Sequence, residues 1–450
     1  MSWGRITVQN LDVSRLVDEA KVGPFHTMII TICAFLLIVD GYDVFIYGVV
    51  LPELMKQWQL TAPQAGSLAS WALFGMMAGA LVFGPLGDRI GRKRTIAVCF
   101  GLFSVATFCN GFATSPTEFG VFRFLAGLGC GGLMPNAVAL TNEYAPKRLR
   151  STLVALMFSG YAVGGMVAAG IGIFMLPRFG WQAMFFAAAV PLLLFPFLLR
   201  ALPESVGFLI RSGREDEARA VLAKLVPGTK ATAETRLVYQ DAGTAGASVA
   251  ELFRGNRTLG TLAMWLCFFC CLLMVYALGS WLPQLMRSAG YSLGSSLSFL
   301  LALNFGGMLG AIFGGRIADR LGLPRVVIGY FALGALCIAL LGLNPAMPVL
   351  YLLIFIAGAG TTGTQILLYA SVAEFYSLAV RSTGLGWASG MGRVGAIVGP
   401  MLGGLLMAAQ LPMAMNFFAF AIPGLIATLA TVVFMVSLRK QQPQTELAAA

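Results

Sequence analysis

Two carboxylic acids lie close together in the first long apolar stretch of the chain. Asp40 and Asp43 are three residues apart, and Tyr47 follows four residues after Asp43. In a helix these three side chains share one face. Two carboxyl groups in a poorly solvated site resist ionising together, because desolvation and like charge both favour the protonated form. We therefore interpret Asp40 and Asp43 as a proton-coupling pair. The alternative is that one of them forms a fixed ion pair with Arg123.

Two arginines within apolar stretches are candidates for binding an anion. Arg123 lies early in its stretch, at a depth comparable with that of Asp43, and Arg393 follows Arg381 by about 18 Å of helix. A guanidinium group stays charged and can hold a carboxylate through two parallel hydrogen bonds. The alternative for Arg393 is an ion pair within the protein or a side chain that reaches for the membrane surface. Uncharged groups that could complete the site are Asn304, Gln365, Tyr276 and Tyr369.

The composition indicates a membrane protein. Of the 450 residues, 58% are hydrophobic and 11% are charged, whereas a water-soluble protein carries roughly 25% charged residues. This excludes a cytosolic enzyme, a nucleic-acid-binding protein and a disordered scaffold. About 20 apolar residues in a helix span a bilayer. The sequence contains twelve such runs, near 25–50, 64–86, 95–113, 117–140, 151–176, 181–201, 259–285, 293–315, 325–343, 348–373, 383–408 and 412–437.

The basic residues predict the orientation of these spans. Most of the 30 Lys and Arg residues lie in the two tails and in the even-numbered connections, whereas Lys56, Arg178 and Arg287 lie on the opposite side. By the positive-inside rule, both termini should be cytoplasmic, in a multi-pass membrane protein. The net charge of +11 then reflects topology and attraction to anionic lipid, with no nucleic-acid partner. We expect no cleaved signal peptide.

Cysteine and histidine usage argues against catalysis and metal binding. The eight Cys residues all lie within apolar runs, and His26 is the only histidine. Buried cysteines in such runs behave as small apolar residues. A histidine-rich metal site or a Ser-His-Asp triad lacks the residues it needs. We therefore expect no enzyme activity, no cofactor and no metal.

The second half of the chain repeats the first at a constant offset of 231 residues. The offset joins corresponding residues over several spans without a gap, which indicates a duplicated unit. Glycines at i, i+4 recur in the second, fifth, eighth and eleventh spans, where they allow close helix packing. The matched charged pairs are Asp88 and Asp319, Arg89 and Arg320, Glu143 and Glu374, and Arg150 and Arg381.

Charged residues without a counterpart in the other half are the candidates for specific function. Such residues inside a membrane span are tolerated toward a cavity or a partner. Under the offset, the unmatched residues are Asp40 and Asp43, which align with Cys271 and Met274, Arg123, which aligns with Ile354, and Arg393, which aligns with Ala162.

The duplicated pattern resembles the major facilitator superfamily. The stretch 84–94, Gly-Pro-Leu-Gly-Asp-Arg-Ile-Gly-Arg-Lys-Arg, is similar to that superfamily's signature between its second and third helices, and 315–322 repeats it. The resemblance implies an all-α membrane protein of twelve helices in two pseudo-symmetric six-helix bundles, with a substrate site between them. The expected units are a cytoplasmic segment 1–23, bundles 24–202 and 259–438, a cytoplasmic linker 203–258 and a tail 439–450.

The same resemblance implies a gate on the cytoplasmic side. Asp88 would meet the start of the helix that opens at Arg381, and Asp319 would meet the start of the helix that opens at Arg150, where exposed N–H groups carry partial positive charge. This latch would form when the protein faces outward. The gating residues implied are Asp88, Arg89, Arg92, Glu143, Arg150, Asp319, Arg320, Glu374 and Arg381.

Within the superfamily, the chain resembles the aromatic acid/H⁺ symporter family, and within it the benzoate transporters. Asp40-Gly-Tyr-Asp43 is similar to that family's D-G-x-D pattern, and the stretches beginning at Arg123 and Arg381 also resemble it. The resemblance implies proton-driven import of an aromatic carboxylate across a bacterial inner membrane. We also expect the protein to be a monomer in the bilayer. With the residues above, the substrate-binding set becomes Arg123, Arg393, Tyr47, Asn304 and Gln365.

Three alternatives stay open. The substrate could be a hydroxylated acid such as 4-hydroxybenzoate. The stretch 395–404 resembles the end of an antiporter motif, which would favour proton-driven export of aromatic compounds. A membrane sensor that binds an aromatic acid without moving it is a remote alternative.

Overall fold

A computed structural model describes residues 10–227, 235–239, 249–254, 257–376 and 378–449, so parts of the expected N-terminal segment and linker lie outside it. The first half contains six long helices: α2 (Pro24–Gln57), α3 (Ala62–Ile90), α4 (Arg92–Asn110), α5 (Pro116–Tyr144), α6 (Arg150–Phe186) and α7 (Ala189–Ala201). The second half contains α10 (Thr258–Ser288), α11 (Leu293–Leu321), α12 (Leu323–Leu341), α13 (Met347–Gly358), the π-helix Ala359–Gly363, α14 (Thr364–Phe375), α15 (Leu378–Ala408) and α16 (Met413–Ala449).

These helices correspond to the twelve predicted spans. In the described part of the chain, ten helical stretches are long and apolar enough to cross a membrane. One of them, Thr152–Ala201, contains two crossings, because Gly180 has φ 75° and reverses the chain inside α6. This left-handed backbone favours glycine. The remaining crossing is α4, whose first turn carries three cations and which therefore falls below the hydropathy of the others.

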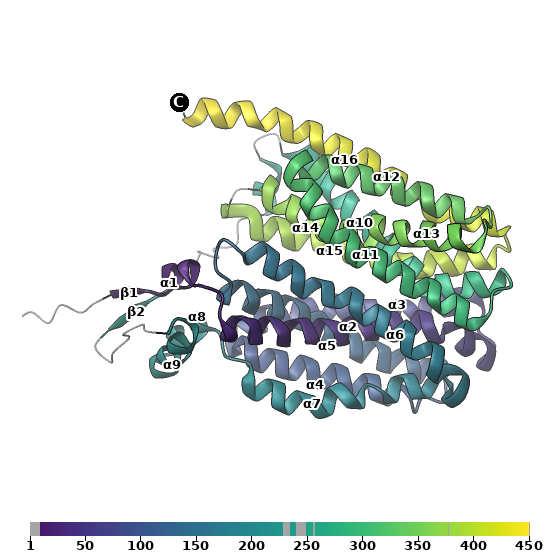
Figure 1. Cartoon of the computed structure of the whole chain (residues 1–450), viewed down its shortest axis with the longest axis horizontal. Helices are drawn as coiled ribbons and strands as arrows, with labels where there is room; N and C mark the ends of the chain where they lie inside the picture. Colours follow the sequence, from purple (N-terminus) through teal and green to yellow (C-terminus); the bar gives the residue numbers. More distant parts are fainter. Residues whose placement is uncertain (1–9, 228–234, 240–248, 255–256, 377, 450) are drawn as a thin grey trace, which may run out of the picture.

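The helices form two bundles (Figure 1). In the first bundle α3 packs on α5 and α2 packs on α6, and in the second α10 packs on α15 and α12 packs on α16. The bundles meet where α3 contacts α15, α6 contacts α11, and α2 contacts α10. The second, fifth, eighth and eleventh spans therefore lie at the interface between the halves.

The internal repeat is visible in the packing of glycines. A Cβ added to Gly75 would collide with the backbone of Phe124, and one added to Gly306 would collide with the backbone of Phe355, its counterpart at the same offset. These contacts confirm that the glycines allow close helix packing. Both contacts lie within a bundle and not between the two bundles.

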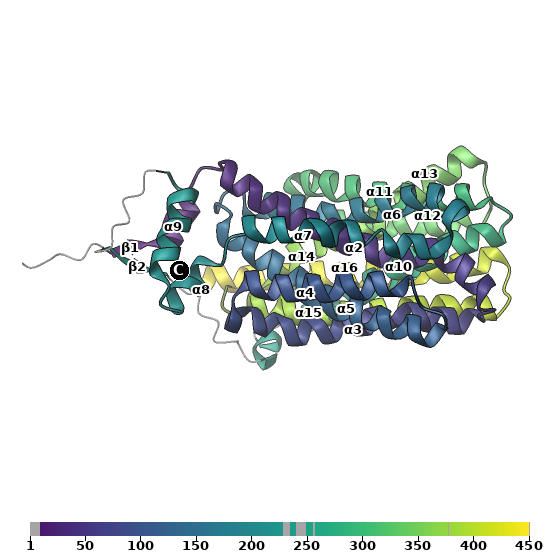
Figure 2. The same ribbon diagram turned by 90° about the horizontal axis from the view of Figure 1, so that it is seen from below.

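Short elements gather at one end of the molecule, which we call the linker end; the opposite end is the far end. Strand β1 pairs in parallel with β2, and Figures 1 and 2 show both strands with α1, α8 and α9 at the linker end. The predicted linker 203–258 contains the helices α8 and α9. The bounds of these elements are β1 Asn10–Asp12, α1 Val13–Glu19, α8 Val206–Arg211, α9 Glu215–Leu225, β2 Arg236–Val238 and a 3₁₀ turn Val249–Phe253.

Candidate functional site

A cavity lies between the two bundles, midway along the long helices. Its volume is about 30 Å³, which leaves room for little more than a water molecule, so the halves close tightly around it. Both halves contribute to its wall. The lining residues are Met76, Met134, Phe158, Ser159, Tyr161, Ala162, Leu272, Tyr276, Gly307, Met308, Thr362, Gln365, Ile366, Tyr369 and Arg393.

Arg393 supplies the positive charge of this cavity. Its guanidinium reaches from α15 to the first bundle, where it contacts the sulfur atoms of Met76 at 3.8 Å and Met134 at 3.7 Å. Thioether sulfur is a weak acceptor. Among the described residues, no carboxylate forms an ion pair with Arg393, although Asp40 is close enough to interact with its charge. The arginine therefore retains its capacity to bind an anion.

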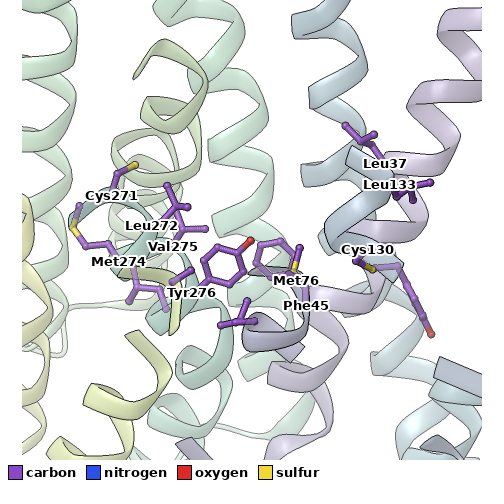
Figure 3. Close-up of a cluster of buried hydrophobic side chains, with 14 of the residues drawn as sticks. Leu37, Phe45, Met76, Cys130, Leu133, Cys271, Leu272, Met274, Val275 and Tyr276 are labelled. Atoms are coloured by element: carbon purple, nitrogen blue, oxygen red, sulfur yellow. The ribbon is translucent and has the colours of Figure 1, made fainter. Parts of the chain in front are cut away.

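Aromatic rings and hydroxyl groups form the rest of the wall. Tyr161 of α6 donates a hydrogen bond to the Tyr276 hydroxyl of α10 at 3.1 Å, across the two halves. Phe158 stacks on Tyr369 with ring centroids 5.8 Å apart and an interplanar angle of 18°. Figure 3 shows Tyr276 together with Met76 and with Phe45, which contacts the Tyr161 ring edge-on. Such a wall suits a flat apolar ring.

Asp43 belongs to a closed polar cluster within the first bundle. Its carboxylate lies 2.9 Å from a guanidinium nitrogen of Arg123 and accepts a hydrogen bond of 2.7 Å from Thr107. Arg123 also donates to the backbone carbonyl of Asp43 at 3.1 Å. The side chains of Asp43 and Arg123 are each 2% exposed. This arrangement satisfies the carboxylate as an ion, which is the fixed ion pair considered as an alternative.

Asp40 differs from Asp43 in having no ion pair with a cation among the described residues. Its side chain is fully buried in α2, and neither carboxyl oxygen has a hydrogen bond of good geometry within the described chain. The Cys130 thiol lies beside it, and the charge of Arg393 acts on it from the cavity. An unpaired buried carboxylate is expensive to keep ionised. Asp40 is therefore the acid of the pair that suits the uptake and release of a proton.

Three residues of the predicted substrate set lie outside the cavity wall. Arg123 is paired with Asp43, and the Tyr47 hydroxyl donates to the carbonyl of Ala65 at 2.6 Å. Asn304 is buried against Gly165 at the interface between α11 and α6. Of that set, the structure brings Arg393 and Gln365 together at the cavity, with Tyr276 and Tyr369 beside them.

Several lining residues escaped the sequence analysis. Tyr161 and Phe158 break the repeat as Arg393 does, because they align with Gly392 and Ser389 at the same offset. The sequence analysis considered only charged residues that lack a counterpart in the other half. Aromatic residues that lack such a counterpart would have included both Tyr161 and Phe158. Thr362 lies in the π-helix Ala359–Gly363, an irregularity that is common at functional sites but has no clear sequence signal. Met76 and Met134 are ordinary apolar residues by sequence.

On the far side of the cavity, several further contacts join the two halves. Glu53 and Arg287 form an ion pair of 2.9 Å, and Ser70 donates to the carbonyl of Ile397 at 2.8 Å. The backbones of Gly48 and Gly279, which are repeat counterparts, also touch there. The cavity is therefore closed on its far side.

The predicted gating residues lie at the linker end, where the predicted latch is not formed. The side chain of Asp88 is 63% exposed, and its ion pair is a weak one of 3.5 Å with Arg92 of its own half. Arg150 pairs with Asp18 of α1 at 2.6 Å, and Arg381 donates to the carbonyl of Tyr376. Of the others, Arg92 pairs with Glu143 at 2.6 Å, and Arg89, Asp319, Arg320 and Glu374 are exposed.

Comparisons with known proteins agree with this architecture. The sequence profile of the Major Facilitator Superfamily matches residues 33–346 and 265–450. The chain superposes on a partially occluded inward-open structure of the xylose transporter XylE from E. coli with a TM-score of 0.69, at 18% identity, covering 90% of this chain and 97% of that one. A bacterial homologue of the lysosomal transporter Spinster superposes with a TM-score of 0.65, at 17% identity, covering 94% and 99%. These likenesses concern the fold.

Curated relatives are similar over nearly their whole lengths. The benzoate transport protein of Acinetobacter baylyi is 45% identical over 97% of this chain and 95% of that protein. The gentisate transporter of Corynebacterium glutamicum is 36% identical, covering 89% and 86%. The 4-hydroxybenzoate transporter PcaK of Acinetobacter baylyi is 35% identical, covering 94% of each chain.

Proposed function

The chain belongs to the major facilitator superfamily of membrane transporters, and from this membership we propose that it imports an aromatic carboxylate, benzoate above all, together with protons. The observation that carries the proposal is the position of Arg393. It is a cation without a carboxylate partner among the described residues, in a cavity walled by Phe158, Tyr161, Tyr276 and Tyr369. A guanidinium suits the carboxylate, and the rings suit the apolar body of the substrate.

The two aspartates have separate roles in this proposal. Asp43 holds Arg123 and thereby fixes α2 against α5, whereas Asp40 carries the coupled proton. Asp40 lies close enough to Arg393 for their charges to interact, so a carboxylate bound by Arg393 and an ionised Asp40 would compete for the same cation. Protonation of Asp40 then favours substrate binding, and this couples the movement of the proton to that of the substrate.

The proposal places the linker end in the cytoplasm of a bacterium, with the protein acting as a monomer in the inner membrane. The basic residues of the tails and linker support this orientation by the positive-inside rule. Contacts between the halves at the far end then correspond to a closed external side. In this structure Asp18 pairs with Arg150 at the start of α6. In the outward-facing state, Asp319 would take the place of Asp18 there.

Closure of the far end can be tested at Gly48. A Cβ at this position would collide with the carbonyl of Gly279, so the Gly48→Ala variant should disfavour the closed external side. Overpacking costs about 1–3 kcal/mol, and we expect initial uptake to slow about five- to hundredfold. Gly170→Ala is the matched control, because nothing lies within 4 Å of its added Cβ. Equal uptake rates in the two variants would contradict this account of the gate.

Arg393 can be tested by direct binding. The Arg393→Gln variant keeps hydrogen-bond donors but loses the charge, and a hydrogen bond to a charged group contributes about 1.5–3 kcal/mol. We expect benzoate to bind about 10- to 100-fold more weakly in calorimetric titrations of the purified protein. Arg325→Gln, which removes an exposed cation at the linker end, should bind benzoate normally. Unchanged affinity in Arg393→Gln would remove this residue from the site.

The function itself is tested by transport into proteoliposomes. With a pH gradient that is acidic outside and with the membrane potential clamped, labelled benzoate should accumulate inside and should do so more than 4-hydroxybenzoate. Preferential accumulation of 4-hydroxybenzoate would reassign the substrate, as the relationship to PcaK allows. Benzoate that is driven out of the vesicles against the proton flow would instead establish the export alternative. If the protein binds either acid but transports neither, only the alternative of a membrane sensor is left.

A further inference from the structure

A second cavity, unrelated to the transport site, lies at the linker end of the first bundle. Its volume is about 380 Å³, and it is lined mainly by the start of α4, the end of α7, and helices α8 and α9. Figures 1 and 2 show α8 and α9 beyond the end of that bundle. Its charged lining consists of five cations and two carboxylates: Lys93, Arg94, Arg200, Arg214, Lys224, Glu204 and Glu217.

Both carboxylates are already engaged. Glu217 forms two hydrogen bonds with Arg214, of 2.8 and 2.6 Å, and these hold the pKa of Glu217 below its usual value. Glu204 is 9% exposed and accepts hydrogen bonds from the backbone N–H groups of Lys93 at 3.0 Å and Ser205 at 2.9 Å. The cavity therefore carries an excess of positive charge.

The surplus charge comes from exposed side chains on three helices. Arg94 of α4, Arg200 of α7 and Lys224 of α9 form no ion pair with any described residue, and all three side chains are exposed. Three cations that converge on one cavity from separate elements form a site for an anion with several acceptor oxygens, such as a phosphate group.

An apolar ridge continues from these cations along the bundle. Val98 lies one turn beyond Arg94 on α4 and is 50% exposed, and Phe197 lies one turn before Arg200 on α7 and is 67% exposed. One turn further along α7, Leu193 is 72% exposed. Because residues at i, i+3 and i, i+4 share a helix face, each arginine stands at the foot of an apolar strip. A free inorganic anion would make no use of these strips.

We propose that this cavity binds the phosphate group of an anionic phospholipid, with the acyl chains lying along Val98, Phe197 and Leu193. Basic pockets at the membrane surface attract anionic headgroups, and each nearby cation strengthens the attraction. The bound lipid would join α4, α7 and α9, and so would hold the linker helices against the first bundle. The inference is independent of which substrate the protein transports.

The internal repeat provides a matched control. Arg94 corresponds to Arg325 at the offset of 231 residues, and Arg325 is likewise exposed at the start of its helix, α12. Arg325 donates to the carbonyl of Leu321 at 3.0 Å and does not line the cavity. Removing Arg325 takes away the same charge at the same end of the molecule without touching the proposed site.

The experiment is a lipid titration of the delipidated full-length protein in neutral detergent, followed by native mass spectrometry. The probes are phosphatidylglycerol, phosphatidylcholine and inorganic phosphate. We expect phosphatidylglycerol to bind more tightly than phosphatidylcholine, and inorganic phosphate to displace neither. The Arg94→Gln/Arg200→Gln variant should bind phosphatidylglycerol about 25-fold more weakly, at about fivefold for each cation. Arg325→Gln should bind it as the unmodified protein does.

The proposal is overturned if Arg94→Gln/Arg200→Gln and Arg325→Gln bind phosphatidylglycerol equally well. It is also overturned if phosphatidylcholine binds as tightly as phosphatidylglycerol, or if inorganic phosphate competes with the lipid. A thermal unfolding scan without lipid establishes that the double variant is folded. Should it unfold early, Lys224→Gln on α9 replaces it, with an expected loss of about fivefold and the same criteria.

Discussion

Replacing Asp40 with asparagine is expected to abolish the accumulation of benzoate under a pH gradient while leaving benzoate exchange intact. The asparagine side chain has the size of a neutral carboxyl group but cannot release a proton. Asp40 is fully buried and lacks a cation partner among the described residues, so its substitution removes no ion pair. In proteoliposomes with a clamped membrane potential, internal benzoate should rise to the external concentration and stop there.

Two further measurements make this prediction specific to the proton. Exchange of labelled for unlabelled benzoate, which needs no net proton movement, should continue in Asp40→Asn. The Asp40→Glu variant keeps a titratable group in a slightly different position, and it should recover part of the gradient-driven accumulation. If Asp40→Asn concentrates benzoate as well as the unmodified protein does, the coupled proton is carried elsewhere.

Replacing Asp43 with asparagine is expected to damage the fold rather than the coupling alone. The side chains of Asp43 and Arg123 are each only 2% exposed, so the substitution leaves the Arg123 guanidinium buried without its counter-charge. Removing one partner of a buried ion pair costs about 3–5 kcal/mol. Equilibrium unfolding in mixed micelles should show this loss in Asp43→Asn and little change in Asp40→Asn.

The double variant Asp43→Asn/Arg123→Met serves as the control for this second prediction. Removing both charges eliminates the unpaired ion, and replacing a buried ion pair with apolar groups is often nearly neutral. We expect the double variant to regain much of the stability lost in Asp43→Asn, which a double-mutant cycle would report as a strong coupling. If the stability losses of Asp43→Asn and Arg123→Met simply add in the double variant, the 2.9 Å ion pair contributes little to stability.

The fold was predictable because its signals are long and repeated. Twelve apolar runs and a constant offset specify two similar bundles, and the structure reproduces that offset in contacts such as Gly75 with Phe124 and Gly306 with Phe355. What each bundle presents to the other was harder to predict. Glycines at i, i+4 allow close packing on any neighbour, so their spacing could not tell contacts within a bundle from contacts between bundles.

The site was predictable in its charges and less so in its geometry. Asp40 and Asp43 lie on the same side of α2. A step of three residues along a helix nevertheless rotates one side chain by about 60° relative to the other. That difference places Asp43 beside Arg123 and Thr107, and Asp40 beside Cys130. A sequence shows that such residues are present, but helix rotation decides their partners. For the same reason Gln365 lines the cavity whereas Asn304 does not.

The parallel pairing of β1 with β2 has a consequence for how the chain is made. Asn10–Asp12 can pair with Arg236–Val238 only after the ribosome has synthesised the whole first bundle and much of the connecting segment. Strand β1 precedes the first bundle in the chain, and it therefore acquires its pairing partner only after that bundle has been synthesised. The segment before the first bundle is thus attached at two places, by this strand pairing with the linker and by the ion pair of Asp18 with Arg150.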